Sequence, residues 1–345
     1  MELSVYLEKQ LRDFNLQVDF TVKDEVFALL GASGCGKSMT LKCIAGIEKP
    51  DKGRIVLDGE VLFDSASGIN LPPQKRQLGY LFQNYALFPN MTVAENLHFV
   101  MKEDSVDKVT ELLQRFHLTG LEDAYPGALS GGQQQRVAFA RVLAAEAKLL
   151  LLDEPFSALD SYLKWQLETE LMDILPAYGG TALLVSHDRG EVYRLADKIA
   201  VINWGQMETP ADKKELFRHP RTLSATLLTG CKNISVAKRE DESHIYAADW
   251  GLSLKTSEEP PLGTRYAGIR AHFLEPRDRA EGENVFPMEV VRVIEDTFSF
   301  IVMVRPPGQA AAPIRLELEK KAWHDLSDSE LFLYFPPEAI MLLEN

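Results

Sequence analysis

The feature that most constrains this chain is the segment Gly31-Ala-Ser-Gly-Cys-Gly-Lys-Ser38, which fits the pattern of a phosphate-binding loop. An apolar run at Val26–Leu30 precedes it, and a helical pattern at Ser38–Ile47 follows it. The segment therefore has the strand–loop–helix context that such a loop requires. A Gly-rich turn with a surface lysine is the alternative interpretation, and this context argues against it.

Glycines in such a loop let backbone N–H groups curl around an anion, and the following helix adds the positive end of its dipole. Lys37 can reach the β- and γ-phosphates of a nucleotide, and Ser38 can offer its hydroxyl to Mg²⁺. The residues predicted to surround the phosphates are Gly31, Ala32, Ser33, Gly34, Cys35, Gly36, Lys37, Ser38 and Met39.

A second candidate site follows the apolar run Leu149–Leu152, which ends in Asp153 and Glu154. One carboxylate at a strand end could hold Mg²⁺ through water, and its neighbour could polarise an attacking water. Taken alone, an acidic strand end is usually a solvated terminus. Beside a phosphate-binding loop on the same sheet, the catalytic interpretation is favoured.

The N-terminal part of the chain alternates short apolar runs with helical patterns, which predicts a mostly parallel sheet with helices packed on it. Leu3–Phe20 instead alternates apolar and polar residues, as an antiparallel edge would. The expected buried strands are Val26–Leu30, Leu149–Leu152, Ala182–Val185 and Ile199–Ile202, and Gln133–Ala145 is an expected helix.

After His219–Pro220 the pattern changes to short strand-like runs separated by proline-rich turns, which indicates a small β-barrel or sandwich. We therefore expect two domains, residues 1–228 and 229–345. The expected strands of the second domain are Ile245–Ala247, Leu252–Leu254, Met288–Val293, Phe300–Val304 and Ile314–Leu318.

Composition narrows the setting in which this chain is expected to work. Asp and Glu outnumber Lys and Arg by 51 to 37, a net charge of −14, so nucleic acid is a poor first partner. Three cysteines, an odd number without paired CxxC spacing, suit a reducing compartment. We see no signal-peptide pattern, and the apolar runs are too short to cross a bilayer. The expectation is a cytosolic chain that serves a membrane only through a partner.

With these features in place, the chain resembles the ATP-binding cassette ATPases. Leu129-Ser-Gly-Gly-Gln-Gln-Gln-Arg136 is similar to the signature sequence of that family. Gln83 matches the Q-loop, Ser157–Asp160 the D-loop, and His187 the switch histidine. These motifs stand in the family order together with the phosphate-binding loop and the Asp153–Glu154 strand, so the resemblance is specific.

The signature also makes physical sense as a second anion site. Ser130 is a natural helix N-cap, and Gly131 and Gly132 leave backbone N–H groups bare at the helix start. The resemblance implies a head-to-tail dimer in which ATP lies between the loop of one copy and the signature of the other. The resemblance implies that Lys37 binds phosphate and that Glu154 acts on water. It also implies that His187 contacts the γ-phosphate and that Asp160 communicates across the dimer. The implied Mg²⁺ ligands are Ser38, Gln83 and Asp153, and the implied signature contacts are Ser130, Gly131, Gly132 and Gln133.

One departure concerns the adenine. The family usually stacks an aromatic residue on this base between the first two strands, but that place holds Leu11, and Phe14 follows three residues later. Adenine could meet Leu11 or Phe14, and packing of Phe14 in the core is an equal alternative.

Within the family, the segments around the phosphate-binding loop and Leu71–Arg76 resemble importer subunits, and Arg54–Ser65 is most similar to those of molybdate and sulfate importers. The resemblance implies a place at the cytoplasmic face of the cell membrane. Its implied partners are an extracytoplasmic solute-binding protein and permease subunits that dock near Gln83–Asn96. In that groove Tyr85, Leu87 and Phe88 would suit a coupling helix, with ordinary core packing as the alternative.

The end of the chain, Asn284–Leu343, resembles the small barrel of molybdenum-binding proteins. Where that barrel holds its anion, this chain has Glu281-Gly-Glu-Asn284 and Phe335-Pro-Pro337. Carboxylates would repel an oxyanion, so we expect a regulatory or dimer-stabilising domain that does not bind molybdate.

The favoured cargo is molybdate, and sulfate, thiosulfate, tungstate or another small solute is the alternative. A soluble cassette ATPase outside transport is a rival of another class. It would need a second cassette or a long coiled coil, which the sequence does not indicate. A passive oxyanion-binding module leaves Glu154 and His187 unexplained.

Overall fold

The computed structural model describes residues 1–101, 105–157, 159–326 and 330–344. The chain forms two compact units, Met1–Lys213 and Lys214–Asn345. This division lies before the domain boundary predicted at residue 228, so two short helices join the second unit, α8 (Lys213–Arg218) for most of its length and α9 (Leu223–Leu228). The predicted boundary between functional domains stays a prediction.

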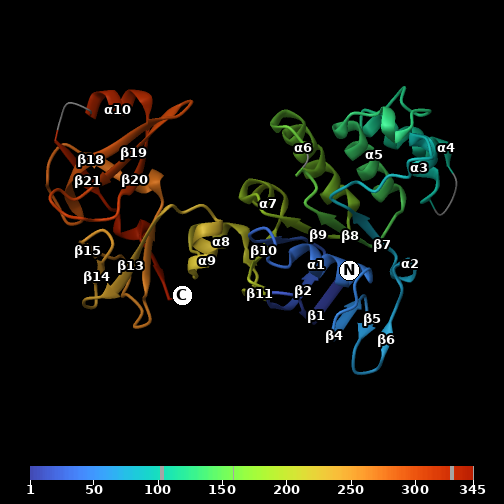
Figure 1. The fold of residues 1–345 in the computed structure, drawn as a ribbon, viewed down its shortest axis with the longest axis horizontal. Coiled ribbons are helices and arrows are strands. Elements are labelled where there is room, and N and C mark those ends of the chain that lie inside the picture. The colour runs from blue at the N-terminus through green and yellow to red at the C-terminus, as the bar shows by residue number, and fades with distance from the viewer. Residues whose placement is uncertain (102–104, 158, 327–329, 345) are drawn as a thin grey trace. The chain divides into compact units, whose positions relative to one another are not determined.

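The first unit is built on a twelve-stranded sheet (Figure 1). Its central strands pair in parallel and are buried along their whole length where the sequence is a continuous apolar run. These strands are β10 (Lys198–Asn203), β3 (Val26–Leu30), β9 (Thr181–Ser186), β8 (Leu149–Asp153) and β7 (Leu78–Leu81). The parallel central part predicted from the sequence is confirmed, but the sheet as a whole is mixed rather than mostly parallel, because its outer strands pair antiparallel.

The outer strands pair antiparallel, and β2 buries every second residue, as its alternating sequence predicts. These strands are β1 (Glu2–Gln10), β2 (Asn15–Lys23), β4 (Lys52–Leu57), β5 (Glu60–Asp64) and β6 (Ile69–Asn70). The short β11 (Gln206–Met207) connects both halves, since it pairs with β10 and with β2, and β12 (Ala211–Asp212) pairs with β10.

Helices of the first unit begin at side-chain caps where the sequence supplies them. Ser130 and Thr92 form capping boxes with Gln133 and Glu95, and Asp160 and Asp188 cap the helices that follow them. The helices are α1 (Lys37–Ala45), α2 (Pro73–Arg76), α3 (Val93–His98), α4 (Val106–Arg115), η1 (Pro126–Ala128), α5 (Gly131–Ala144), α6 (Ser161–Tyr178) and α7 (Arg189–Leu195).

The second unit contains two five-stranded antiparallel sheets whose inner faces share one apolar core. Ile245, Val302 and Leu333, from three different strands, are all fully buried in it. The strands are β13 (Asn233–Arg239), β14 (His244–Ala247), β15 (Leu252–Lys255), β16 (Tyr266–Ile269), β17 (Glu275–Arg277), β18 (Val285–Glu295), β19 (Ser299–Arg305), β20 (Ile314–Glu319), β21 (Leu331–Tyr334) and β22 (Met341–Leu343), with η2 (Ala271–Phe273) and η3 (Pro337–Ala339) between them. This agrees with the small barrel expected from the sequence.

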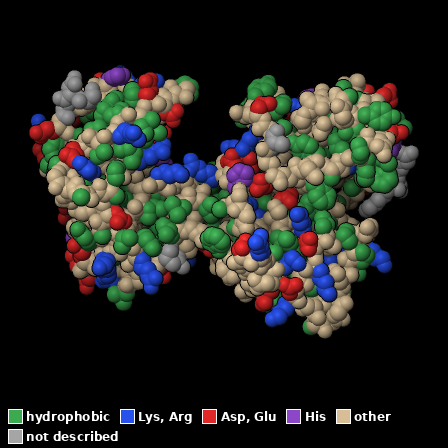
Figure 2. Space-filling model, in the orientation of Figure 1, with side chains coloured by type: hydrophobic (Ala, Val, Ile, Leu, Met, Phe, Trp, Pro, Cys, Tyr) green, Lys and Arg blue, Asp and Glu red, His purple; other side chains and the backbone are tan. Residues whose placement is uncertain are grey.

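One helix of the second unit, α10 (Lys320–Leu326), was not expected, because its charged start and short length resemble a turn. None of the helices in the described parts of the chain has the length and apolar character needed to span a bilayer. On the face shown in Figure 2, Lys and Arg side chains of the first unit are interspersed with Asp and Glu rather than gathered in one basic field.

Candidate active site

The predicted site residues follow three neighbouring parallel strands. β3 leads into the phosphate-binding loop, β8 ends at Asp153, and β9 ends just before His187. Because β8 and β9 pair in parallel, as do β9 and β3, their carboxyl ends meet at one edge of the sheet. The fold thus brings together residues that are far apart in the sequence.

The phosphate-binding loop is shaped by glycines at positions that other residues would strain. Gly34 and Gly36 have left-handed backbone angles, with φ of 81° and 113°. At Gly31 a Cβ would come within 2.4 Å of the Ile202 carbonyl oxygen on β10. The loop therefore keeps its backbone close to the neighbouring strand.

Lys37 is almost fully buried, with 3% of its surface exposed. Its Nζ donates hydrogen bonds to the carbonyl oxygens of Gly31 and Ala32, at 2.8 and 2.9 Å. It also lies 3.9 Å from the Cys35 Sγ; burial raises the pKa of that thiol, and the cation offsets this only in part. The ammonium group is thus held at the centre of the loop, where an anion bound by the loop would meet it.

Both carboxylate oxygens of Asp153 accept hydrogen bonds from hydroxyl groups. The Ser38 hydroxyl donates to its Oδ1 at 2.6 Å, and the Tyr80 hydroxyl donates to its Oδ2 at 2.9 Å. Burial first, and then the Asp153 charge, raises the pKa of Tyr80. Hydroxyl and carboxylate oxygens are ligands that suit Mg²⁺, so the pair formed by Ser38 and Asp153 fits that ion. Tyr80 opens the stretch Tyr80-Leu-Phe-Gln83 that contains the Q-loop glutamine, but no feature of the sequence assigned it a role of its own.

Glu154 belongs to a separate group. Its backbone is left-handed, with φ of 45°, and its N–H donates to the Val185 carbonyl at 3.0 Å. The side chain has one oxygen 3.3 Å from the His187 Nδ1, and its other oxygen accepts from the Gln83 amide at 3.4 Å. The turn at Glu154 therefore directs two adjacent carboxylates to different partners.

Of the predicted magnesium ligands, Gln83 is placed on the Glu154 side. Its amide nitrogen contacts Glu154 Oε2 and lies 3.5 Å from the Ser157 hydroxyl, which in turn donates to the Glu154 carbonyl. Gln83 thus links this carboxylate to the start of the D-loop. Position 158 of that loop lies outside the described residues.

Asp160, at the end of the D-loop, caps α6 by accepting from the N–H groups of Tyr162 and Leu163, at 3.0 and 3.1 Å. Its predicted role across a dimer stays a prediction. At the signature, the Ser130 hydroxyl accepts from the Gln133 N–H, and the Gln133 side chain accepts from the Ser130 N–H. Ser130 is exposed, so this helix start is presented to solvent.

A partly buried polar network flanks His187 and was not predicted from the sequence. Lys164 on α6 lies 2.6 Å from a carboxylate oxygen of Asp188 and 2.6 Å from one of Glu191. The Ser186 hydroxyl donates to Glu191 and accepts from the Asp188 N–H. The residues on either side of His187 are thus tied to the helix that follows the D-loop.

The charges in this network shift each other's titration. Burial alone would lower the pKa of Lys164 and raise that of Asp188. The hydrogen bonds and charge attraction between them outweigh burial, so the pKa of Lys164 is raised and that of Asp188 is lowered. Each group therefore stabilises the charged form of the other.

We expect Lys164→Met to lower the free energy of unfolding by about 1–2 kcal/mol, less than for a fully buried pair, because Lys164 and Asp188 are partly exposed. It should also slow ATP turnover, because His187 loses its support. Because the pKa of Asp188 is lowered in the folded state, its ion pair stabilises the fold at pH values above the ordinary pKa of about 4. This stabilisation is lost as the pH falls through the folded-state pKa. Denaturation and turnover measurements at pH 7 and below pH 4 test this, with Lys164→Arg as the charge-retaining control; an unchanged Lys164→Met protein would contradict it.

The aromatic residue considered for adenine is half-buried. Phe14 packs against the core of the first unit and makes a T-shaped contact with Trp204, with ring centroids 6.2 Å apart. Leu11 is also partly buried against that core. Packing accounts for Phe14, and the predicted contact with adenine stays a prediction.

The segment expected to receive a membrane subunit is held by buried polar side chains. Arg141 donates to the carbonyls of Tyr85 and Ala86, and Asn96 bonds both backbone groups of Phe88. Phe88 contacts Phe99, a residue that the sequence analysis missed and that is 61% exposed. An exposed aromatic side chain therefore lies next to a loop whose backbone is held by hydrogen bonds.

Comparisons with known proteins agree with this geometry. The ABC transporter family profile matches residues 13–157. The chain is 37% identical to the molybdenum import ATP-binding protein ModC of Paramagnetospirillum magneticum over 84% of each chain. It is 40% identical to the sulfate/thiosulfate import ATP-binding protein CysA of Mannheimia succiniciproducens, over 91% of this chain and 88% of that protein.

Two further similar proteins align with smaller parts of this chain. The putrescine transport ATP-binding protein PotG of Escherichia coli is 42% identical over 67% of this chain, which spans 62% of that protein's length. Among solved structures, the ATP-binding cassette MJ0796, a dimer in a post-hydrolysis state bound to ADP and Pi, aligns with a TM-score of 0.52 and 26% identity. That alignment covers 62% of this chain and 99% of the other.

Proposed function

Because this chain belongs to the ABC transporter family, among the ATP-hydrolysing subunits of importers, we propose that it powers uptake of an oxyanion, molybdate first among them. The observation that carries the ATP-hydrolysing part of the proposal is the grouping of two carboxylates with different partners at one sheet edge, whereas the cargo is proposed from the similarity to ModC and CysA. Asp153 bonds Ser38, and Glu154 contacts His187 and Gln83.

In the proposed reaction, Lys37 and the loop N–H groups bind the phosphates of ATP. Ser38 and Asp153 would hold Mg²⁺, which neutralises phosphate charge when bound. Glu154 orients a water and accepts its proton, because its carboxylate is free of the Ser38–Asp153 pair and lies against His187. His187 stands 52% exposed beside this carboxylate, where it can contact the γ-phosphate.

We further propose that ATP joins two copies head to tail. The start of α5 supports this, because a helix N-terminus with exposed Ser130 and Gly131 favours an anion. ATP bound in the loop of one copy would meet this helix start in the other. Hydrolysis would then separate the copies, which turns chemistry into movement.

The permease subunits are proposed to dock beside Phe88 and Phe99, at the cytoplasmic face of the membrane. An exposed apolar side chain next to a backbone held by Arg141 and Asn96 suits an amphipathic helix. An extracytoplasmic solute-binding protein is the expected third component of the importer.

The proposed cargo is tested in cells that lack this chain and are then given it back, by measuring uptake of labelled molybdate, sulfate and putrescine. Restored molybdate uptake alone supports the proposal. Restoration of sulfate or putrescine uptake without molybdate would leave the importer ATPase in place and replace its cargo. No restoration of any of them would contradict a role in uptake of these solutes.

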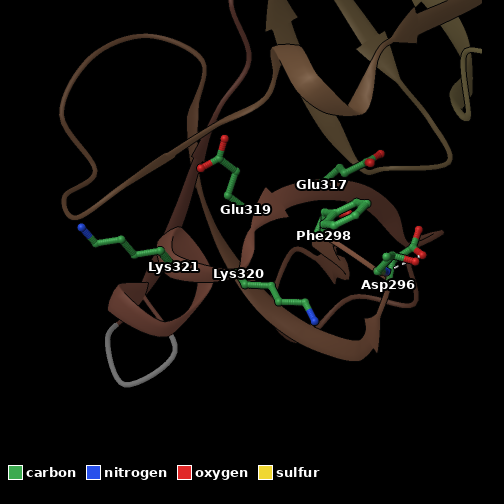
Figure 3. Close-up of a pocket in the computed structure, with 8 residues that line it drawn as sticks. Asp296, Phe298, Glu317, Glu319, Lys320 and Lys321 are labelled. Carbon is green, nitrogen blue, oxygen red and sulfur yellow. Dashed lines mark hydrogen bonds between the residues drawn. The ribbon is translucent and has the colours of Figure 1, made fainter.

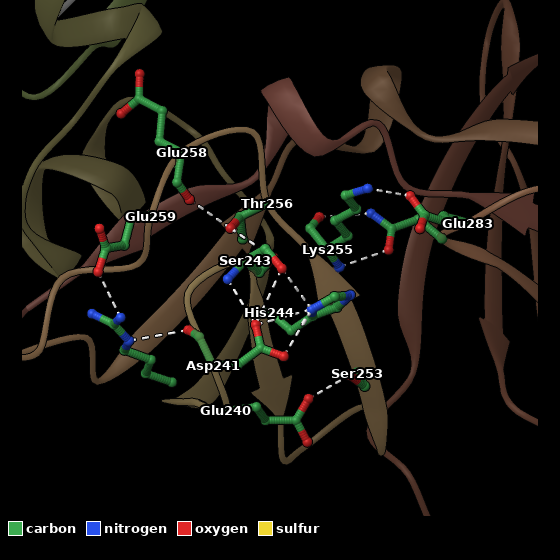
Figure 4. A network of polar contacts seen from close by, with 12 residues as sticks. Glu240, Asp241, Ser243, His244, Ser253, Lys255, Thr256, Glu258, Glu259 and Glu283 are labelled. Carbon is green, nitrogen blue, oxygen red and sulfur yellow. Dashed lines mark hydrogen bonds and ion pairs between the residues drawn. The ribbon is translucent and has the colours of Figure 1, made fainter.

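For the second unit we propose a regulatory or dimer-stabilising role, in a domain of the type found in other importers and in molybdenum-binding proteins. Asn284, where an anion was considered, is buried and fully engaged: its side chain bonds both backbone groups of Lys255 and the Phe335 carbonyl. The nearby Lys255 ammonium pairs with Glu283 at 2.5 Å (Figure 4). This cation is therefore already neutralised.

One cavity in the described part of the second unit is also poorly suited to an oxyanion. It measures about 750 Å³ and lies between the β18–β19 turn and α10 (Figure 3). Asp296, Glu317 and Glu319 line it, and Lys320 pairs with Glu295. Glu317 is itself paired with Arg315, which leaves Asp296 and Glu319 against Lys321, so repulsion of an anion is expected.

We therefore expect the full chain to show no micromolar binding of molybdate when titrated by calorimetry. Sulfate serves as the matched control anion. Saturable micromolar heat from molybdate, lost in an Asn284→Ala protein, would contradict this expectation and make the second unit a molybdate sensor.

A further inference from the structure

An aromatic side chain outside all the sequence motifs lies beside the phosphate-binding loop. Trp204 stands in the turn between β10 and β11, with left-handed φ of 46°, and its side chain is 70% exposed. A single exposed apolar residue is common on protein surfaces and proves nothing by itself. What distinguishes Trp204 is its location beside the phosphate-binding loop.

The backbone on either side of Trp204 is attached to the loop. The Gly205 N–H donates to the Cys35 carbonyl oxygen at 3.1 Å. On the other side, the Ile202 carbonyl oxygen packs so closely on Gly31 that no Cβ would fit. The tryptophan is thus fixed in position relative to the place where the phosphates are proposed to bind.

Phe14 packs against Trp204 and supports its ring. Its ring lies between two glycines: a Cβ on Gly205 would come within 2.4 Å of it, and one on Gly36 within 3.6 Å. The rings of Phe14 and Trp204 meet at 87°, an edge contact that orients the indole and leaves most of its surface free. Phe14 is half-buried, whereas most of the Trp204 side chain is exposed.

We infer that the indole of Trp204 stacks on the purine base of the bound nucleotide. The inference rests on the proposed function, because it requires a nucleotide whose phosphates occupy the loop. A purine is a flat π system that gains by stacking on an aromatic face, and a pre-oriented indole loses little freedom on binding. Leu11, at the place considered from the sequence, offers no such face.

The test compares ADP with pyrophosphate, which has the phosphates but no base, by calorimetry on the full chain. Trp204→Asn removes the ring and suits the left-handed backbone. We expect it to weaken ADP binding roughly tenfold and to leave pyrophosphate binding unchanged, while Trp204→Phe stays within about threefold of the original. Trp165→Ala is the matched control, because Trp165 is 63% exposed on α6 of the same unit.

The outcomes separate the inference from the proposed function. If Trp204→Asn binds ADP like the original chain while Lys37→Ala does not bind it, the stacking role is wrong and nucleotide binding stands. Equal losses for ADP and pyrophosphate would also overturn stacking, because the loop itself would then be disturbed. If Lys37→Ala binds ADP normally, the proposed phosphate site fails, and the inference fails with it.

Discussion

A Glu154→Gln protein is expected to bind ATP and to hydrolyse it roughly 100-fold more slowly or worse. The amide keeps the size of the side chain and its contact with Gln83, but it cannot accept a proton from water. Asp153 cannot replace it, because the Ser38 and Tyr80 hydroxyls occupy its oxygens. Phosphate release measured at saturating ATP tests this expectation.

The same variant should accumulate the ATP-joined dimer, since closure without hydrolysis cannot reverse by chemistry. Size-exclusion chromatography with and without ATP checks this second consequence. Glu111→Gln, an exposed glutamate on α4, is the matched control and should behave like the original chain. Turnover by Glu154→Gln at more than about a tenth of the original rate would remove Glu154 from the role of base.

The second large effect is expected from Lys37→Ala, which should lower ATP affinity roughly 100-fold and abolish uptake in cells. Removing one partner of a buried charge–phosphate contact leaves the other unpaired, and such losses are large. Lys37 is 3% exposed, so solvent screens this contact weakly. Equilibrium binding of ATP and uptake by cells are the two measurements.

Folding has to be checked here, because the Lys37 ammonium also bonds the loop carbonyls of Gly31 and Ala32. Thermal unfolding of the variant, together with pyrophosphate binding, separates a lost contact from a collapsed loop. Lys42→Ala, later in α1, is the control for charge removal on the same helix. Normal ATP binding and sustained uptake by Lys37→Ala would refute the proposed nucleotide site.

Local sequence was enough to predict the elements that carry the chemistry. The apolar runs of β3, β8 and β9 can only be stable where both faces are covered, which requires a parallel sheet with helices. Parallel strands end at one edge, so the residues that follow them are brought together whatever the rest of the chain does. The grouping of Ser38 with Asp153 and of Glu154 with His187 follows from this rule.

Other features could not be predicted, because they depend on which side chains meet across the fold. Tyr80 had no predicted role although it stands in the Q-loop stretch, and Trp204 belongs to no motif. Their proximity to Asp153 and to the loop depends on the pairing of β7 with β8 and of β11 with β2. The division of roles between Asp153 and Glu154 was expected in outline, but the left-handed turn that separates them is visible only in the structure.

The sequence by itself determined the phosphate-binding loop, the buried strands of the parallel part of the sheet, and the residue types available for ATP chemistry, because glycine conformation, apolar periodicity and helix capping act over a few residues. Only the tertiary structure decided that Phe14 is packed between glycines and that the Asn284 side chain is hydrogen-bonded to backbone groups of the second unit. It also decided that Lys164 connects α6 to the segment around His187. The reason is that burial and hydrogen-bond partners are set by contacts between distant segments, which no local pattern contains.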